Sequence, residues 1–290
     1  MEDNYLAFAA ELAVAAGEII RQGFNRASVI AVKADGSPVT DIDVRVNRLV
    51  VETIQRRYPG HGVRGEEQDL GTGAETYQWI CDPLDGTLPY LNGLQNSLFM
   101  LALTRESEVL AAVAYDPFAD HMYRAARQGG AFCDRRRIRV ARLGLGAGRV
   151  LLGTSSAALI EAVARMAGHV ELVRGTGFKS MMVARGEAVG TVKETADFHD
   201  VAPSALIVTE AGGRVTALDG SPLALDREIT AGVIFSNNMA HDRLVEAVAC
   251  RAASGCSQGG NSPWRDLENW RCARSRTCAM VAIGRPMRCS

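Results

Sequence analysis

The sequence predicts a mixed α/β protein in which helices and strands form layers around a substantial core. Stretches with apolar residues three and four positions apart, typical of helices, alternate with short apolar runs that end at turn residues, typical of strands. The runs between 109 and 140 follow one another closely, which indicates an antiparallel sheet in the first half. A length of 290 residues, 47% of them hydrophobic, suffices to bury a large core.

Each element follows from its local pattern. Turn residues at Gly129-Gly130 divide the antiparallel succession, and Gly212-Gly213 gives a stop signal after a helical stretch. The last ordered unit spans 231–249 and ends in a helix-like segment. The expected helices are 5–23, 43–58, 157–168, 178–185 and 200–211, and the expected strand regions are 77–82, 109–118, 121–140, 148–154, 170–176 and 214–218.

The composition changes after about residue 250. Residues 251–290 contain seven arginines, two acids and no sustained periodicity, so we expect a domain over 1–250 followed by a disordered tail. Within the domain, the halves are expected at about 1–140 and 141–250. The alternative for the tail is a small element anchored by Trp264 and Trp270, and its arginines leave nucleic-acid binding as a minor alternative.

Charge and hydropathy exclude several classes of protein. With 32 basic and 33 acidic residues there is no overall basic field to attract nucleic acid or an anionic membrane. No run reaches the ~18 apolar residues that a membrane span needs, and the N-terminal segment lacks a signal-peptide pattern, so a cytoplasmic location is expected. The spacing of the seven cysteines matches no CxxC pair, which argues against a structural zinc site.

Two aspartates lie close together in "CDPLDGT". Asp82 is expected to end an apolar strand, Pro83 blocks helix continuation, and Asp85 precedes Gly86-Thr87, where it is expected to cap the next helix. Two carboxylates so close repel one another unless a proton or a cation lies between them. An all-oxygen site of this kind suits Mg²⁺.

The segment after the aspartates adds a site for an anion. The backbone amides of Gly86, Thr87 and Leu88 are expected to open a helix, where unpaired N–H groups attract phosphate. Other acids at predicted element boundaries are candidates to join the pair: Asp43, Glu66, Glu67 and Asp200. A metal beside an amide cradle indicates a phosphate ligand.

Five segments together resemble the lithium-sensitive, magnesium-dependent inositol monophosphatase family. The resemblance covers about residues 5–250 and implies a layered α-β-α-β-α sandwich of the inositol monophosphatase and fructose-1,6-bisphosphatase type. The segments, in the family's order, are "VKADGSPVTDID" (32–43), "GHGVRGEE" (60–67), "DPLDGTLPY" (82–90), "GGAF" (129–132) and "DVAPSALIVTEAGG" (200–213).

The resemblance implies a role for each matched residue. One Mg²⁺ would be held by Glu66, Asp82 and the carbonyl of Leu84, and a second by Asp82, Asp85 and Asp200, with a weaker third ion near Glu66. The phosphate would be held by the amides of Gly86 and Thr87, and Thr87 with Asp43 would orient and activate the attacking water. Lys33 corresponds to a family lysine near the loop that completes the metal site. Phosphoryl transfer of this type needs no serine or cysteine nucleophile.

The chain departs from the family pattern near the expected site. Pro89 and Tyr90 replace an Asn and an aromatic residue, and the proline is expected to shift the first helical turn slightly. His199 stands where the family has Trp; it either replaces a packing ring or contacts the substrate or a water. His61 is expected to serve loop structure rather than catalysis.

The resemblance implies Mg²⁺-dependent hydrolysis of a small phosphorylated polyol, with inositol 1-phosphate as the default substrate. Histidinol phosphate, fructose 1,6-bisphosphate and a 3′-phosphorylated adenine nucleotide stay open, as does a non-catalytic binding module of the same fold. Lys179 or Arg174 would favour a second anionic group on the substrate, unless both are simply solvated. Family members are often homodimers, so a homodimer is implied.

Overall fold

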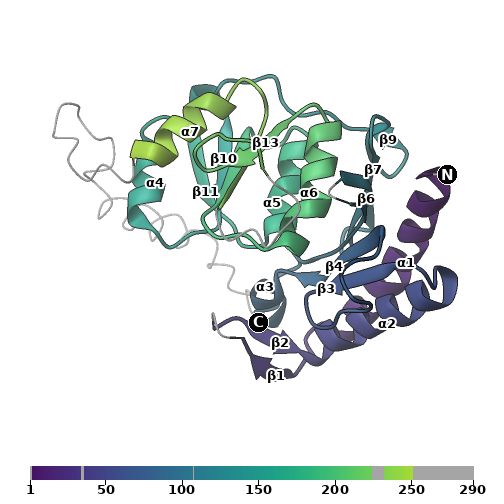
Figure 1. Ribbon diagram of the computed structural model, residues 1–290. Coiled ribbons are helices and arrows are strands. Elements are labelled where there is room, and N and C mark those ends of the chain that lie inside the picture. The colour runs from purple at the N-terminus through teal and green to yellow at the C-terminus, as the bar shows by residue number, and fades with distance from the viewer. Residues whose placement is uncertain (1, 34–35, 107, 224–231, 251–290) are drawn as a thin grey trace, which may run out of the picture. The chain divides into compact units, whose positions relative to one another are not determined.

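Two β-sheets alternate with three pairs of helices in five layers (Figure 1). The computed structural model describes residues 2–33, 36–106, 108–223 and 232–250, so the predicted tail lies outside the described residues. The layering agrees with the predicted fold class, whereas the boundary between the two halves stays a prediction. The helix pairs, from one outer layer to the other, are α1 (Glu2–Gly23) with α2 (Asp41–Arg57), α5 (Thr176–Ala184) with α6 (Phe198–Glu210), and α4 (Ala157–Ala164) with α7 (His241–Cys250).

The first sheet has seven strands in sequential order. All neighbours pair antiparallel except β3 and β4, which confirms the antiparallel succession expected between 109 and 140. Helices cover both faces of its central strands, so β5 and β6 are almost continuously buried. The strands are β3 (Gly62–Gly65), β4 (Tyr77–Asp85), β5 (Leu98–Arg105), β6 (Glu108–Asp116), β7 (His121–Ala126), β8 (Gly130–Cys133) and β9 (Arg136–Arg137).

The second sheet has five strands in the order β11-β10-β12-β14-β13. The crossovers through α4 and α5 make β10 parallel to both of its neighbours, and β14 pairs antiparallel on each side. A short 3₁₀ turn, η1 (Leu145–Ala147), precedes this sheet. The strands are β10 (Arg149–Leu152), β11 (His169–Leu172), β12 (Gly190–Lys193), β13 (Arg214–Ala217) and β14 (Val233–Ser236).

A small hairpin, β1 (Val29–Val32) with β2 (Pro38–Thr40), leads directly into α2. The helix begins at Asp41 because Thr40 caps it: the Asp43 amide donates to Thr40 Oγ1 at 3.4 Å, and the Thr40 amide donates to Asp43 Oδ2 at 2.8 Å. This capping box starts the helix two residues before the predicted boundary and fixes the carboxylate of Asp43.

Strand β4 carries the aspartate pair differently from the sequence prediction. The strand does not end at Asp82 but continues to Asp85, with a register shift against β5 between the two residues. A bulge of this kind re-aims side chains and lets both carboxylates reach one region. Gly86 follows with φ +87°, a left-handed conformation that favours glycine, and α3 (Thr87–Leu91) begins after it.

Pro89 fits into α3 without breaking it, since it lies within the first turn, where backbone N–H groups have no partner inside the helix. The neighbouring Tyr90 is buried, and its hydroxyl donates to the carbonyl oxygen of Ile20 at 2.7 Å. Tyr90, one of the two residues that depart from the family pattern, therefore anchors α3 to α1.

Among the helices of the described residues, none combines the length and the apolar character that a membrane crossing needs.

Candidate functional site

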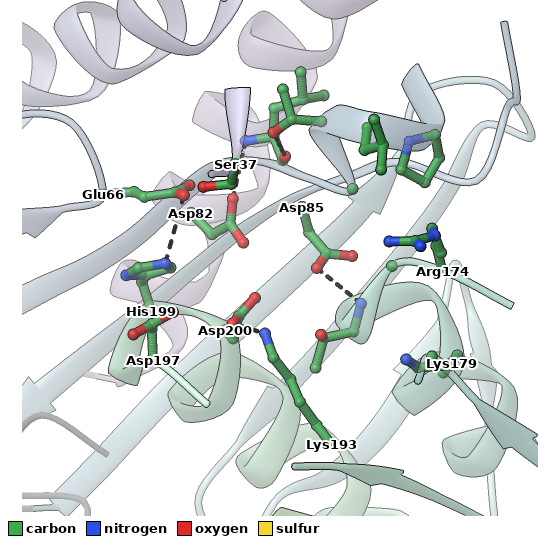
Figure 2. Close-up of a pocket in the computed structure, with 18 of the residues that line it drawn as sticks. Ser37, Glu66, Asp82, Asp85, Arg174, Lys179, Lys193, Asp197, His199 and Asp200 are labelled. Carbon is green, nitrogen blue, oxygen red and sulfur yellow. Dashed lines mark hydrogen bonds and ion pairs between the residues drawn. The ribbon is translucent and has the colours of Figure 1, made fainter. Parts of the chain in front are cut away.

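A pocket of about 260 Å³ lies where β4, α3, α5 and α6 meet (Figure 2). Its polar lining comes from both halves of the chain. Asp82 and Asp85 project from β4, Glu66 follows β3, and Asp200 lies in the first turn of α6. The structure therefore brings together four of the acids that the sequence singled out.

The carboxylates are close enough to share a cation. One oxygen from each of Asp82, Asp85 and Asp200 lies within 4.8 Å of the others, and Glu66 forms a second such group with Asp82 and His199. The three aspartates are only 2%, 4% and 6% exposed. The Leu84 amide donates to Asp82 Oδ1 at 3.0 Å, which holds that side chain at the bulge.

Burial and mutual repulsion dominate the electrostatics of the aspartate pair. Burial raises the pKa of Asp82 well above its usual range, and the carboxylates of Glu66, Asp85 and Asp200 raise it further. Burial also raises the pKa of Asp85 to about 6, again helped by Asp200. Ionised carboxylates in this position need a positive charge between them.

Asp200 differs because it has a cation beside it. Burial alone would raise its pKa, but Lys193 and His199 lower it below the ordinary aspartate value. The Lys193 ammonium forms an ion pair with Asp200 Oδ2, and both residues line the pocket. Lys193 thus supplies one positive charge at the place where a metal would bind.

A second lysine, Lys33, supplies positive charge at the opposite end of the carboxylate group, beside Glu66. Lys33 forms ion pairs with Glu66 and with Glu67 Oε1, the latter at 2.9 Å. Burial opposes protonation of Lys33, but the two glutamates raise its pKa above the usual lysine range. The predicted site residue Lys33 therefore lies against a predicted metal ligand.

The donor set fits a hard divalent cation. Three buried carboxylates from β4 and α6 converge on one point, and a fourth lies beside Asp82. Oxygen ligands with high negative charge and room for water match the preferences of Mg²⁺. The nearby lysines neutralise part of this charge without filling the pocket.

Asp85 does not cap α3 as the sequence predicted. Its two oxygens accept hydrogen bonds from the amides of Thr176 and Gly177, each at 2.9 Å, so it caps the start of α5 instead. Gly86 occupies the N-cap of α3 without a side-chain hydrogen bond. The reason is tertiary: the bulge in β4 turns Asp85 toward the helix that packs beneath the sheet.

Thr87 and Asp43 meet at the edge of the pocket. Thr87 Oγ1 lies 3.3 Å from Asp43 Oδ1 and 3.2 Å from the Leu84 carbonyl oxygen, so its hydroxyl can donate to either. Burial raises the pKa of Asp43 to about 6, although its hydrogen bonds with Thr40 oppose the change. The predicted pair is assembled, with Asp43 buried and Thr87 open to the pocket.

The two predicted histidines have different surroundings. His199 lines the pocket, with Nε2 3.7 Å from Glu66 Oε1, so it faces the carboxylates rather than serving only as a packing ring. His61 stacks against Tyr58 and Tyr77, and its Nδ1 accepts a hydrogen bond from Trp79 Nε1 at 3.1 Å. His61 thus packs among aromatic side chains of the fold, in agreement with the structural role expected for it.

Sequence reasoning missed Lys193 and the α5 amides as parts of the site. Lys193 ends β12, seven residues before Asp200, and that position at the end of a strand beside a motif helix was the available signal. The amides of Thr176 and Gly177 left no signal of their own, since backbone donors are present at every helix start.

Comparison with known proteins gives a consistent result. The model of a family described as the inositol monophosphatase family matches residues 1–253. An inositol-1-monophosphatase of Mesorhizobium japonicum is 30% identical over 252 residues, covering 82% of this chain and 93% of that protein. A histidinol-phosphatase of Chlorobaculum parvum is 30% identical, covering 84% and 96%. The structure of an IMPase from Thermotoga maritima superposes with a TM-score of 0.81 at 26% identity, covering 86% and 98%.

Proposed function

The chain belongs to the inositol monophosphatase family, and we propose from that premise that it is a Mg²⁺-dependent phosphatase acting on a small phosphorylated polyol or sugar. The reaction class, hydrolysis of a phosphoric monoester, is that of the family. The observation that carries the proposal is the group formed by Asp82, Asp85 and Asp200, whose buried oxygens lie within 4.8 Å of one another in the pocket.

The pocket residues would hold two metal ions, or three. Glu66, Asp82 and the carbonyl of Leu84 would hold one, while Asp82, Asp85 and Asp200 would hold another. When bound, such ions lower the pKa of a water and neutralise phosphoryl oxygens. This assignment requires Lys193 and Lys33 to give up part of their contact with Asp200 and Glu66.

Thr87 and Asp43 would position the attacking water and receive its proton. The Thr87 hydroxyl, 3.3 Å from Asp43 Oδ1, can donate to that carboxylate while its own oxygen accepts from a water in the pocket. A pKa of about 6 suits Asp43 to accept a proton near neutral pH. Glu66, exposed to the same pocket, would assist from the other side.

The phosphate would lie against the start of α3, where the amides of Gly86 and Thr87 border the pocket beside Asp85. The left-handed Gly86 leaves the backbone open to close approach. His199 and Lys33, which both contact Glu66, would bind phosphate oxygens from the Glu66 side of the site.

The default substrate is inositol 1-phosphate, which the name of the Mesorhizobium relative supports, while the histidinol-phosphatase relative keeps histidinol phosphate open. Fructose 1,6-bisphosphate and a 3′-phosphorylated adenine nucleotide remain candidates as well.

A homodimer is also proposed, and light scattering of the purified protein would test it.

A panel of phosphomonoesters tests the function directly. The purified protein is incubated with each substrate, with Mg²⁺ or with a chelator, and released phosphate is measured. We expect release that depends on Mg²⁺ and differs between substrates. A sample that is folded by circular dichroism, yet releases no phosphate from any substrate at any Mg²⁺ concentration, would favour the non-catalytic binding module instead.

A further inference from the structure

Three side chains with different metal-ligating atoms meet at one end of the β7–β8 hairpin, toward the sheet edge that β9 forms (Figure 1). His121 begins β7, Cys133 ends β8 directly after the "GGAF" segment, and Asp134 follows in the turn before β9. One nitrogen, sulfur or oxygen atom of each lies within 4.8 Å of the other two. None of the three residues lines the pocket, so this hairpin cluster is separate from the acidic group.

The backbone fixes the carboxylate of the hairpin cluster. Asp134 has a left-handed conformation with φ +56°, which is uncommon outside glycine. Its amide donates to the Met122 carbonyl oxygen at 2.8 Å, and the Met122 amide donates to Asp134 Oδ1 at 2.9 Å. The Arg124 side chain also donates to the Asp134 carbonyl oxygen at 2.8 Å. Oδ1 is therefore engaged by the backbone, while Oδ2 contacts His121 and Cys133.

The distances between the donor atoms are close to those of tetrahedral coordination. His121 Nδ1 lies 3.1 Å from Asp134 Oδ2, and Cys133 Sγ lies 3.8 Å from the same oxygen. Bond lengths of about 2.0 Å to nitrogen and oxygen and about 2.3 Å to sulfur place these pairs about 3.3 and 3.5 Å apart around a tetrahedral ion. Each observed distance differs from that geometry by only a few tenths of an ångström.

The kind of donor atom selects the metal. One imidazole, one thiol and one carboxylate suit Zn²⁺, whereas Mg²⁺ prefers oxygen ligands alone. The carboxylate and a thiolate together balance the charge of a divalent ion. The absence of a CxxC pair does not bear on this cluster, because it uses one cysteine together with a histidine and an aspartate.

We propose that His121, Cys133 and Asp134 form a binding site for Zn²⁺, with a water molecule as the fourth ligand. The side chains of His121 and Asp134 are 37% and 47% exposed, so an ion can reach them from solvent. The thiol proton is released to solvent on binding, because the thiolate is the metal ligand. The ion would join the start of β7 to the end of β8, and it should stabilise the folded chain in proportion to its occupancy. The site does not depend on the proposed function.

Co²⁺ serves as a spectroscopic probe of this site. The full-length protein, reduced with a phosphine and supplied with excess Mg²⁺ to occupy the acidic group, is titrated with Co²⁺. A thiolate ligand gives a charge-transfer band in the near ultraviolet, which carboxylates alone do not give. We expect this band to appear, and Zn²⁺ to abolish it by displacing Co²⁺. Zn²⁺ should also raise the thermal midpoint in the same buffer.

Variants assign the band to individual ligands. Cys133→Ser should abolish the part of the band that wild type owes to this site. His121→Gln and Asp134→Asn should weaken Co²⁺ binding by more than the roughly tenfold loss typical of an outer-shell change. Cys250→Ser and His169→Gln remove the same groups from exposed positions elsewhere in the described chain, so they are matched controls and should bind as wild type does. Circular dichroism verifies that each variant is folded.

The result can overturn the proposal in two ways. Folded wild-type protein that shows neither a charge-transfer band with Co²⁺ nor a higher thermal midpoint with Zn²⁺ has no such site. A band that keeps its intensity and its Co²⁺ affinity in folded Cys133→Ser or His121→Gln arises from another part of the chain and also refutes the site. Phosphate release by wild type is unaffected by either outcome, so the proposed function is tested separately.

Discussion

Replacing Asp85 with Asn should change the folding stability little while strongly reducing the stabilisation by metal. At neutral pH the ionised carboxylate is disfavoured in the fold, because its pKa is raised from an ordinary value near 3.8 to about 6. That difference corresponds to about 3 kcal/mol of stability, present when the group is protonated and lost as the pH rises through the folded-state pKa. Neutral Asn removes this penalty.

The same substitution loses a hydrogen bond. The two oxygens of Asp85 accept from Thr176 and Gly177, and an amide can accept with only one of them. Leaving one buried N–H without an acceptor costs about 1–3 kcal/mol. The two effects nearly cancel, so the free energy of unfolding of the metal-free variant should lie within about 2 kcal/mol of wild type at pH 7.5.

Urea denaturation with chelator and with Mg²⁺ measures both quantities. At a Mg²⁺ concentration 100 times its dissociation constant, wild type should gain about 2.7 kcal/mol. A variant whose affinity falls 100-fold should gain about 0.4 kcal/mol, and its turnover should fall at least 100-fold. If Asp85→Asn keeps the full Mg²⁺ stabilisation and turnover within threefold of wild type, Asp85 is not a metal ligand.

Asp116 offers a matched control for this experiment. It is also buried, burial also raises its pKa, and it accepts hydrogen bonds from the amides of Phe118 and Ala119 at 2.9 and 3.0 Å. It does not line the pocket. Asp116→Asn should therefore keep the wild-type Mg²⁺ response, whatever its effect on stability.

Three other outcomes test different parts of the site and fold. Lys193→Met should bind Mg²⁺ about tenfold more tightly by calorimetry, because the ammonium no longer competes for Asp200; equal or weaker binding would contradict the ion-pair argument. Thr87→Ala should lower kcat about 100-fold and Thr87→Ser less than tenfold, and equal losses would remove the hydroxyl from the mechanism proposed with Asp43. Burial lowers the pKa of His241 to about 4, so its contribution is present above the unfolded-state value near 6.5 and lost as the pH falls. The fall in metal-free stability from pH 7 to 5, measured in urea, should thus be about 2 kcal/mol smaller in His241→Gln; identical falls would refute this.

The candidate residues of the acidic group were accessible from sequence because they lie in short local motifs. Asp82 and Asp85 lie three positions apart in one short motif, and Asp200 lies at the start of a helix whose apolar pattern and glycine stop are both visible. The partner of Asp85 was not accessible, because the amides it contacts are more than 90 residues away. Its role as the cap of α5 is a consequence of tertiary packing and of the bulge in β4.

Three of the strands that the sequence prediction missed lack a useful pattern. Both faces of β5 are buried between helix layers, so its residues do not alternate between apolar and polar. Strands β3 and β12 have only four residues each and include glycine, which weakens any strand signal. The layered architecture was nevertheless predictable, because the long helices carry clear periodicity and the apolar runs of the antiparallel succession follow one another closely, with turn residues at Gly129-Gly130.

The contact between Asp85 and α5 also makes this chain a candidate for a split reporter. Asp85 belongs to β4 of the first sheet, whereas the amides that hold it come from the segment after β10, in the second half of the chain. A cut between β9 and β10 would leave Asp82 and Asp85 on one fragment and Asp200 on the other. Because neither fragment would contain the whole acidic group, recovery of hydrolysis on mixing would measure the docking of the two fragments.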